Sequence, residues 1–286
     1  MREEHQDVFG IWQKHLPEWG FEFSAILHLI LALSALHLGH DQPELRDQYI
    51  RQADHHFTFG VQSVTAIISQ LNPENCQMVY MAAVMICFIY FGRGPRPGEY
   101  LIFSEHGPAE WVVLMNGVKL ILHLHHEKVF SGILEPSGEG ISCEFIPAMR
   151  AELHEHRIHL EEVQLFLEAE NAENNELDLK LAALHDLFEL LYEMYEKISV
   201  GKSGVFLMDV LIGWIYRRPE EFVHLSEKCD PGALVIFAHW AVLLKYMETS
   251  WFMEGWAKHV LTGISGSLHV RHRSWIEWPL QKVEKA

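Results

Sequence analysis

The sequence has few cysteines, few basic residues and no long apolar run, and each shortage excludes a class of protein. Its four cysteines lie at positions 76, 87, 143 and 229, and none forms a C-x-x-C pair. This spacing excludes a zinc binuclear cluster or a zinc ribbon, and scattered cysteines suit a reducing compartment. The 22 basic residues face 39 acidic ones, for a net charge of −17. We therefore expect no direct binding to nucleic acid, whose phosphates require cationic side chains.

Membrane and secretion signals are also missing. The longest apolar stretch covers 78–91, which is shorter than the roughly 20 residues that a membrane-spanning helix needs. The first ten residues, MREEHQDVFG, contain no apolar segment of the kind found in secretory signals. We expect an intracellular protein, cytoplasmic or nuclear, with no membrane span.

Motifs for common cofactors are absent. The sequence contains no G-x-x-x-x-G-K-[ST], G-x-G-x-x-G or G-x-S-x-G pattern, and no D-D-x-x-D cluster. The stretch HEHRIH (154–159) is close to the zinc motif H-E-x-x-H, but Ile158 occupies the place of the second ligand. We therefore expect no metal and no cofactor, and we interpret the histidines of this cluster as surface residues without a role.

The hydrophobic periodicity is helical along nearly the whole chain. Asn72 and Asp230 each precede a proline, which is typical of a helix start with the polar residue as N-cap. We expect helices near 8–16, 22–39, 44–70, 74–91, 108–126, 144–170, 175–199, 204–217, 219–228, 231–248 and 252–267.

Three of these segments are apolar on nearly every side, namely 24–38, 78–91 and 233–247. A helix of this kind is surrounded by other helices. The loops at 92–100 and 134–142 are too short to be inter-domain linkers. We therefore predict an all-α fold, a single-domain helical array over residues 1–286 with central buried apolar helices. Such an array either fills its interior, which is the commoner outcome, or leaves an apolar pocket.

Four segments resemble a known family: FSAILHLILALSALHL (23–38), LNPENCQMVYMAAVMICF (71–88), EWVVLMNGVKLIL (110–122) and the stretch 233–264; the closing HRSWIEWPLQKV (272–283) also fits. They are similar to the effector region of the sterol uptake control group of fungal zinc-cluster transcription factors. The resemblance implies an all-helical domain that binds an apolar small molecule, a sterol in the best-understood members, and it favours the interior pocket. In that family an N-terminal zinc cluster binds DNA. This sequence shows no such cluster, so the resemblance does not carry DNA binding over.

Two kinds of residue are candidates for a site. His28, His37 and His239 interrupt apolar helices, and a buried imidazole needs a hydrogen-bond partner. The ordinary explanation is a core histidine bonded to a backbone carbonyl; the functional alternative is a group that orients a ligand or transfers a proton. As candidate catalytic residues we take His239, Tyr246 and His28. As candidate ligand-binding residues we take the apolar and aromatic side chains at helical spacing, for which core packing is an equally good explanation: Met81, Met85, Phe88, Trp111, Met115, Phe237, Trp240, Leu244, Trp251, Phe252 and Trp256.

Three functions agree with these features. A sterol-sensing regulatory domain follows from the resemblance. A cofactor-free cyclase or isomerase of fungal secondary metabolism would act on a terpenoid or polyketide, for example by intramolecular [4+2] cyclisation. Positioning alone can supply roughly 7–11 kcal/mol for such a step. A non-catalytic interaction scaffold would have a filled core. The missing zinc cluster makes us favour the cyclase slightly over the sensor. The expected partner is an apolar small molecule, and a homodimer stays an open alternative.

Overall fold

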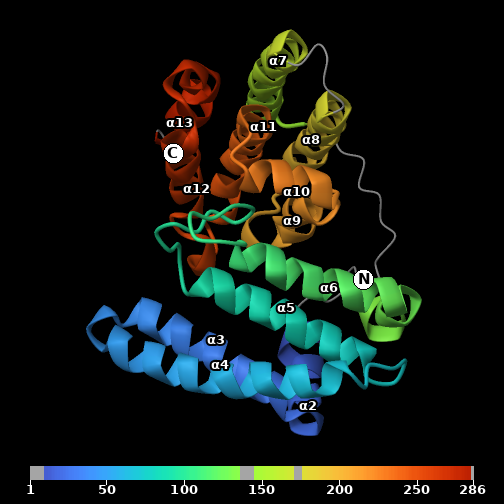
Figure 1. Ribbon diagram of the computed structural model, residues 1–286. Helices are drawn as coiled ribbons and strands as arrows, with labels where there is room; N and C mark the ends of the chain where they lie inside the picture. Colours follow the sequence, from blue (N-terminus) through green and yellow to red (C-terminus); the bar gives the residue numbers. More distant parts are fainter. Residues whose placement is uncertain (1–9, 136–144, 171–175, 285–286) are drawn as a thin grey trace. The chain divides into compact units, whose positions relative to one another are not determined.

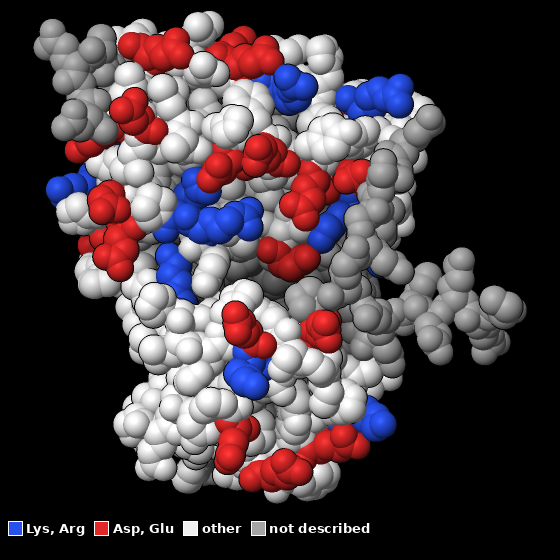
Figure 2. Space-filling view, turned by 90° about the vertical axis from the view of Figure 1, so that its right-hand side faces the viewer, with Lys and Arg blue, Asp and Glu red and all other residues white. Residues whose placement is uncertain are grey.

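The computed structural model describes residues 10–135, 145–170 and 176–284. Most of these residues are helical and none is in a strand; an isolated bridge joins Glu99 and Ser104. The all-α prediction is confirmed. Carboxylates are spread widely over the face shown in Figure 2, with fewer Lys and Arg side chains between them, as the net charge of −17 requires.

The chain forms two compact units, each with its own internal packing (Figure 1). Unit 1 comprises residues 1–93 and 113–140, and unit 2 comprises residues 94–112 and 141–286. The prediction of one domain over 1–286 stays a prediction, and the two units are described separately below.

Unit 1 is a set of antiparallel and crossing helices. Its closest packing joins α3 to α4, and α3 also packs on α2 and α5. Gln77 of α5 donates from Nε2 to the carbonyl oxygens of Val129 and Ser131, at 3.0 and 2.8 Å, and so ties α5 to the end of α6. The elements are η1 (Ile11–His15, π-helical), α2 (Leu16–Glu22), α3 (Ser24–Asp41), η2 (Pro43–Leu45), α4 (Arg46–Ile68), α5 (Cys76–Gly92), α6 (Glu110–Val129, in unit 1 from residue 113) and η3 (Gly132–Leu134).

Helix α3 is less enclosed than its composition predicts. Ala25, Ile26 and Leu29 are buried, but Leu31 and Leu38 are each 40% exposed, so one side of the helix is open. The prediction of a fully buried helix over 24–38 is wrong for this side. By length and composition alone α3 could cross a membrane, the one helix among the described residues that could. Its inner face packs on α4 and α5 as a core helix does.

A glycine sets the distance between α3 and α4. A Cβ atom on Gly60 would lie 2.8 Å from two side-chain carbons of Leu29. We expect Gly60→Ala to destabilise the protein by about 1–3 kcal/mol, because overpacking forces the two helices apart. Gly117→Ala on α6 is the matched control, since no atom lies within 4 Å of the added carbon there. The control should be neutral or stabilising by up to about 1 kcal/mol. Urea unfolding of both variants measures the difference, and equal effects would contradict this account.

Unit 2 surrounds a central helix, α11 (Pro231–Ala241), in which every residue from 232 to 241 is buried. The segment is apolar except for His239, so it can be covered on all sides by α7, α8, α10, α12 and α13. The surrounding elements are α7 (Pro147–Glu170), α8 (Glu176–Ser199), η4 (Gly204–Leu207), α9 (Met208–Tyr216), α10 (Glu220–Glu227), η5 (Val242–Met247), η6 (Trp251–Met253), α12 (Trp256–Ser267), η7 (Val270–Ile276) and α13 (Glu277–Glu284).

Asp230 fixes the start of α11, as predicted from sequence. Its Oδ1 accepts from the backbone N–H of Ala233 at 2.9 Å, and Pro231 occupies the first turn. The same carboxylate lies 2.9 Å from Nζ of Lys180, a residue of α8 that is 1% exposed. One side chain therefore serves both as helix cap and as counter-ion of a buried cation.

Three boundary predictions need correction. The α-helix expected over 231–248 ends at Ala241 and continues as 3-10 turns over 242–247. The helix expected from 74 begins at Cys76, because Asn72 accepts from the N–H groups of Glu74 and Asn75 and so caps a turn instead. The chain after residue 267, for which no helix was predicted, forms η7 and α13. The predicted loop at 134–142 lies mostly outside the described residues.

Candidate functional site

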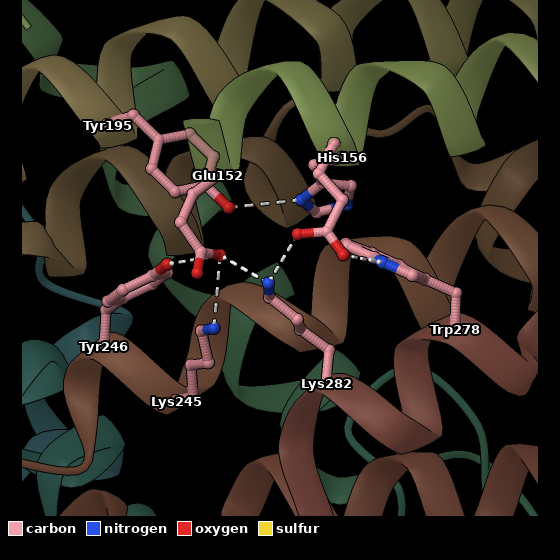
Figure 3. A network of polar contacts seen from close by, with 8 residues as sticks. Glu152, His156, Tyr195, Lys245, Tyr246, Trp278 and Lys282 are labelled. Carbon is pink, nitrogen blue, oxygen red and sulfur yellow. Dashed lines mark hydrogen bonds and ion pairs between the residues drawn. The ribbon is translucent and has the colours of Figure 1, made fainter. Parts of the chain in front are cut away.

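A network of polar side chains joins α7, α8, η5 and α13 of unit 2 (Figure 3). Glu152 on α7 is its centre. Its Oε2 accepts from the hydroxyl of Tyr246 at 3.4 Å and lies 3.6 Å from Nζ of Lys245 and 3.0 Å from Nζ of Lys282. Burial lowers the pKa of Lys245, and the nearby Glu152 carboxylate opposes that shift. The two lysines thus have their charges balanced by α7.

Glu155, one helical turn along α7, holds the C-terminal helix. It accepts from Nζ of Lys282 at 2.7 Å and from the indole Nε1–H of Trp278 at 2.9 Å. These two hydrogen bonds lower the pKa of Glu155. The bonds fix the position of the Trp278 ring, which carries one wall of the cleft described below.

Two buried histidines lie beside this network. His156 Nδ1 is 3.4 Å from the hydroxyl of Tyr195, and the rings of His156 and His239 have centroids 5.7 Å apart. His239 stacks on Trp278 with centroids 5.6 Å apart and planes at 12°. Burial lowers the pKa of His156 well below its usual value and that of His239 to about 3. Both imidazoles are therefore neutral at pH 7.

Among the described residues, the Nε2 atom of His156 and the Nδ1 atom of His239 are buried without a hydrogen-bond partner. The other nitrogen of His239, Nε2, lies 3.4 Å from the carbonyl oxygen of Trp275. Unpaired buried nitrogens cost free energy, so these two atoms mark the network as a region to examine for a site.

A cleft of about 370 Å³ opens next to the network. It lies at the low end of the volumes that small-molecule sites have. His239 and Trp278 belong to its wall, and the buried ring of His156 contacts both of them. The lining residues come from α7, α11, η7 and α13: His159, Glu162, Val163, His239, Ser274, Trp275, Glu277, Trp278 and Gln281.

The chemistry that this arrangement supports is hydrogen bonding and charge recognition rather than proton transfer. A general acid or base works best with a pKa near the ambient pH. Burial raises the pKa of Tyr246 far above its usual value and lowers that of His239 to about 3, so neither residue is suited to exchange protons at pH 7. Within the described ranges, no group of three or more His, Cys, Asp or Glu residues is placed to hold a metal ion.

The structure divides the predicted site residues between the two units. Of the candidate catalytic residues, His239 lines the cleft and Tyr246 belongs to the network. The third, His28, lies on α3 of unit 1, where its Nδ1 is 2.9 Å from Nδ1 of His56. Unit 1 also holds Met81, Met85, Phe88 and Met115, all buried. Unit 2 holds Trp111, Phe237, Trp240, Leu244 and Trp256, which are buried, and Trp251 and Phe252, which are half-buried.

Several site residues were not predicted from the sequence. His156 was interpreted as a surface histidine, which is wrong, because the structure buries it completely. Its apolar helical neighbours Leu153 and Leu160, three and four residues away on α7, were the signal that could have placed it inward. Trp275 and Trp278 were noted as part of a closing segment but not as candidates, although two tryptophans at i and i+3 share a helix face.

The neutral histidine gives a pH prediction. His239 has a folded-state pKa of about 3, below the value near 6.5 of the unfolded chain, so the unfolded state binds more protons between these two values. This group therefore stabilises the fold above about pH 6.5, and the contribution falls as the pH decreases toward 3. Between pH 7.5 and pH 5.5 we expect a loss of about 1 kcal/mol from His239 alone.

The variant His239→Gln tests this by urea unfolding at both pH values. Glutamine does not titrate, so the difference between the two pH values should shrink by about 1 kcal/mol. His185→Gln is the control, because the His185 side chain is 74% exposed. An unchanged pH difference in His239→Gln would show that this histidine is not held neutral by the fold.

Comparison with known proteins gives two findings. Residues 8–146 match the family described as fungal specific transcription factor domain. A Zn(2)-C6 fungal-type transcription factor of Gibberella zeae is 22% identical over 293 residues, which cover 95% of this chain and 56% of that protein. The chain thus spans little more than half the length of this relative. No solved structure matches. The chain is similar to fungal transcription factors, and the cleft lies outside the stretch that matches the family.

Proposed function

We propose that the chain is a regulatory domain of the fungal transcription-factor type, and that the cleft of unit 2 binds the small molecule to which it responds. The observation that carries the proposal is the alignment with the Gibberella zeae transcription factor over 95% of this chain. The family match over 8–146 agrees with it. A nuclear location follows from this function.

The cleft is the support for a ligand. It has the volume of a small-molecule site, a rigid aromatic wall and a buried imidazole beside it. The sequence-based expectation of a sterol or terpenoid, and membership of the sterol uptake control group, stay predictions. The lining combines indole rings with carboxylates, so it is not the uniformly apolar wall that suits a sterol.

A transcriptional readout tests the proposal. The full chain is fused to a heterologous DNA-binding domain in yeast, and a reporter gene under the matching operator is measured. We expect the fusion to change reporter output several-fold relative to the DNA-binding domain alone, and Trp275→Ala in the cleft wall to alter that output. Glu189→Gln, on the exposed face of α8, is the matched control. A fusion that occupies the operator and leaves transcription unchanged in every growth condition would refute a regulatory role.

One observation favours a second candidate function. His239, the predicted catalytic histidine, lines the cleft and has a buried nitrogen free to hydrogen-bond. A cofactor-free cyclase would act mainly by folding the substrate in the cleft, because Nε2–H of His239 already donates to the carbonyl oxygen of Trp275 and Nδ1 can only accept. Incubation of the purified protein with linear terpenoid and polyketide intermediates tests this, with His239→Ala as the comparison. Cyclisation no faster than in buffer rejects the enzyme and leaves the regulator.

Native mass spectrometry of the protein purified from a fungal host separates these functions further. A co-purifying small molecule supports a ligand-binding domain, and its identity distinguishes a sensed ligand from a cyclised product. A protein that is folded but carries no ligand supports the third hypothesis, an interaction scaffold. The same spectrum reports whether the chain is a homodimer.

A further inference from the structure

Helix α6 of unit 1 (Figure 1) carries an apolar stripe on its outer face. Val113, Leu120 and Leu124 are 57%, 51% and 55% exposed. Together with Gly117 they follow one another at steps of four, three and four residues, which places all four on one side of the helix. The stripe ends before His125, where the backbone departs from helical geometry. Its roughly 300 Å² of apolar surface has the size of patch that is often functional on a soluble monomer.

Gly117 leaves a gap in the middle of this stripe. A Cβ atom there would lie within 4 Å of no other atom, so the space above the glycine is open. This differs from Gly60, where Leu29 occupies the space that a side chain would need. Glycine inside a helix costs about 1 kcal/mol relative to alanine, and at Gly117 packing within the chain does not explain that cost. The gap can take a side chain that comes from outside the chain.

The stripe lies on a part of the sequence that has no negative charge, in a protein that is strongly acidic elsewhere. The net charge of the chain is −17, yet residues 111–126 contain no aspartate or glutamate. Two copies of such a chain repel one another wherever their carboxylate-bearing surfaces meet. A face without carboxylates is therefore a place where a second copy can approach with little electrostatic cost.

From the exposed stripe, the open glycine and the absence of carboxylates we propose that α6 is the interface of a symmetric homodimer, in which the α6 helices of two copies pack antiparallel. In a two-fold interface, residue i contacts residue j of the other copy and j contacts i. The register that places Leu120 over Gly117 of the other copy also places Val113 beside Leu124 of the other copy, so each larger side chain faces a smaller one. A parallel pair would set glycine against glycine and leave a void.

The ends and the size of this interface are consistent with a weak dimer. In the same register Glu110 lies near Glu127 and Lys128 of the other copy, and Arg96 already pairs with Glu110. Each end then holds two carboxylates and two cations, so its charges balance. Two helices of this length bury on the order of 1,000 Å² in total, the lower limit for a specific interface, and we expect a dissociation constant on the order of 10 μM. This inference goes beyond the proposed regulatory function and does not depend on it.

Sedimentation equilibrium of the purified full chain tests the dimer. The protein is measured from about 1 to about 200 μM in about 0.3 M NaCl, which screens the repulsion between two acidic copies. We expect the wild type to change from monomer to dimer over this range. Leu120→Glu should raise the dissociation constant at least about tenfold, because it buries a charge in the interface. Leu165→Glu is the matched control, since it adds the same charge at a leucine of α7 that is 66% exposed, and it should change little.

Gly117→Leu distinguishes this register from unspecific apolar contact. The monomer has open space for the side chain, and leucine favours a helix more than glycine does, so the variant should fold. In the proposed dimer the added side chain takes the place of Leu120 from the other copy, and we expect association about tenfold weaker. An unspecific apolar surface would associate more strongly, because leucine adds apolar area. The double variant Gly117→Leu/Leu120→Gly exchanges the two positions and should restore part of the association.

Three results would overturn the proposal, and circular dichroism confirms beforehand that each variant is folded. The first is a wild type that stays monomeric at the highest concentration, which would leave the stripe for a partner of another kind. The second is a dimer that Leu120→Glu weakens no more than Leu165→Glu does, which would place the interface on another surface. The third is tighter association of Gly117→Leu, which would show unspecific contact in place of the antiparallel pair.

Discussion

Asp230→Ala is expected to reduce the free energy of unfolding by about 3–5 kcal/mol, most of it from the loss of the counter-ion of a buried lysine. The side chain of Lys180 is 2% exposed, and both carboxylate oxygens of Asp230 lie 2.9 Å from its Nζ. The ammonium group is thus shielded from bulk water. Removing the carboxylate therefore leaves a positive charge inside unit 2 without this partner.

The same substitution also removes the cap of the central helix. Oδ1 of Asp230 accepts from the N–H of Ala233, and the loss of an N-cap costs about 1 kcal/mol. Asp230→Asn separates the two effects, because asparagine caps helices nearly as well as aspartate but has no charge. We expect Asp230→Asn to retain the stabilisation from the N-cap and to lose most of the stabilisation from the ion pair with Lys180.

Urea unfolding followed by circular dichroism measures these variants. The double variant Asp230→Asn/Lys180→Met should regain much of the lost stability, since replacing a buried pair with apolar groups is often neutral. Asp209→Ala is the control, because that carboxylate is 70% exposed in its pair with Lys197 and should contribute no more than about 1 kcal/mol. A loss in Asp230→Ala as small as in the control would show that Lys180 is solvated by other means.

The sequence predicted the helical fold well because most helices carry their own signals. The periodicity located α4, α5, α7 and α8 to within a few residues, and the motif Asp230-Pro231-Gly232 predicted the start of α11. The sequence-based prediction failed where burial depends on contacts with segments elsewhere in the chain. The composition of 24–38 predicts complete burial, but the neighbours of α3 in the fold leave Leu31 and Leu38 partly exposed.

The site was predicted only where one residue departs from its surroundings. His239 stands out because it interrupts an otherwise apolar helix. His156 does not stand out, because it belongs to a run of charged and histidine residues on α7, and its burial depends on Tyr195 and Trp278, which come from distant segments. The cleft itself could not be predicted, since α7 and α13 meet through ion pairs between Glu152, Glu155 and Lys282 that no local pattern encodes.

Trp240→Ala is the second substitution for which we expect a large effect, a loss of about 3–5 kcal/mol of stability. The sequence made Trp240 a candidate ligand-binding residue, and the structure buries it completely. Its ring stacks on Phe237 at 5.0 Å and on Trp214 at 6.1 Å, with planes at 12° and 22°. Removing a side chain packed in this way leaves a cavity that the surrounding helices cannot fill.

The hydrogen bond of Trp240 distinguishes a core role from a role in binding. Its Nε1–H donates to the carbonyl oxygen of Leu211 at 3.1 Å, so Trp240→Phe should keep most of the packing and lose about 1–2 kcal/mol with this bond. Trp251→Ala, at a half-buried ring that was also a candidate, should cost less than Trp240→Ala because water already reaches it. Unfolding curves of the three variants give the order directly. If Trp240→Ala is as stable as the wild type and only ligand binding is lost, the ring lines a pocket, and this result would support the predicted interior apolar site.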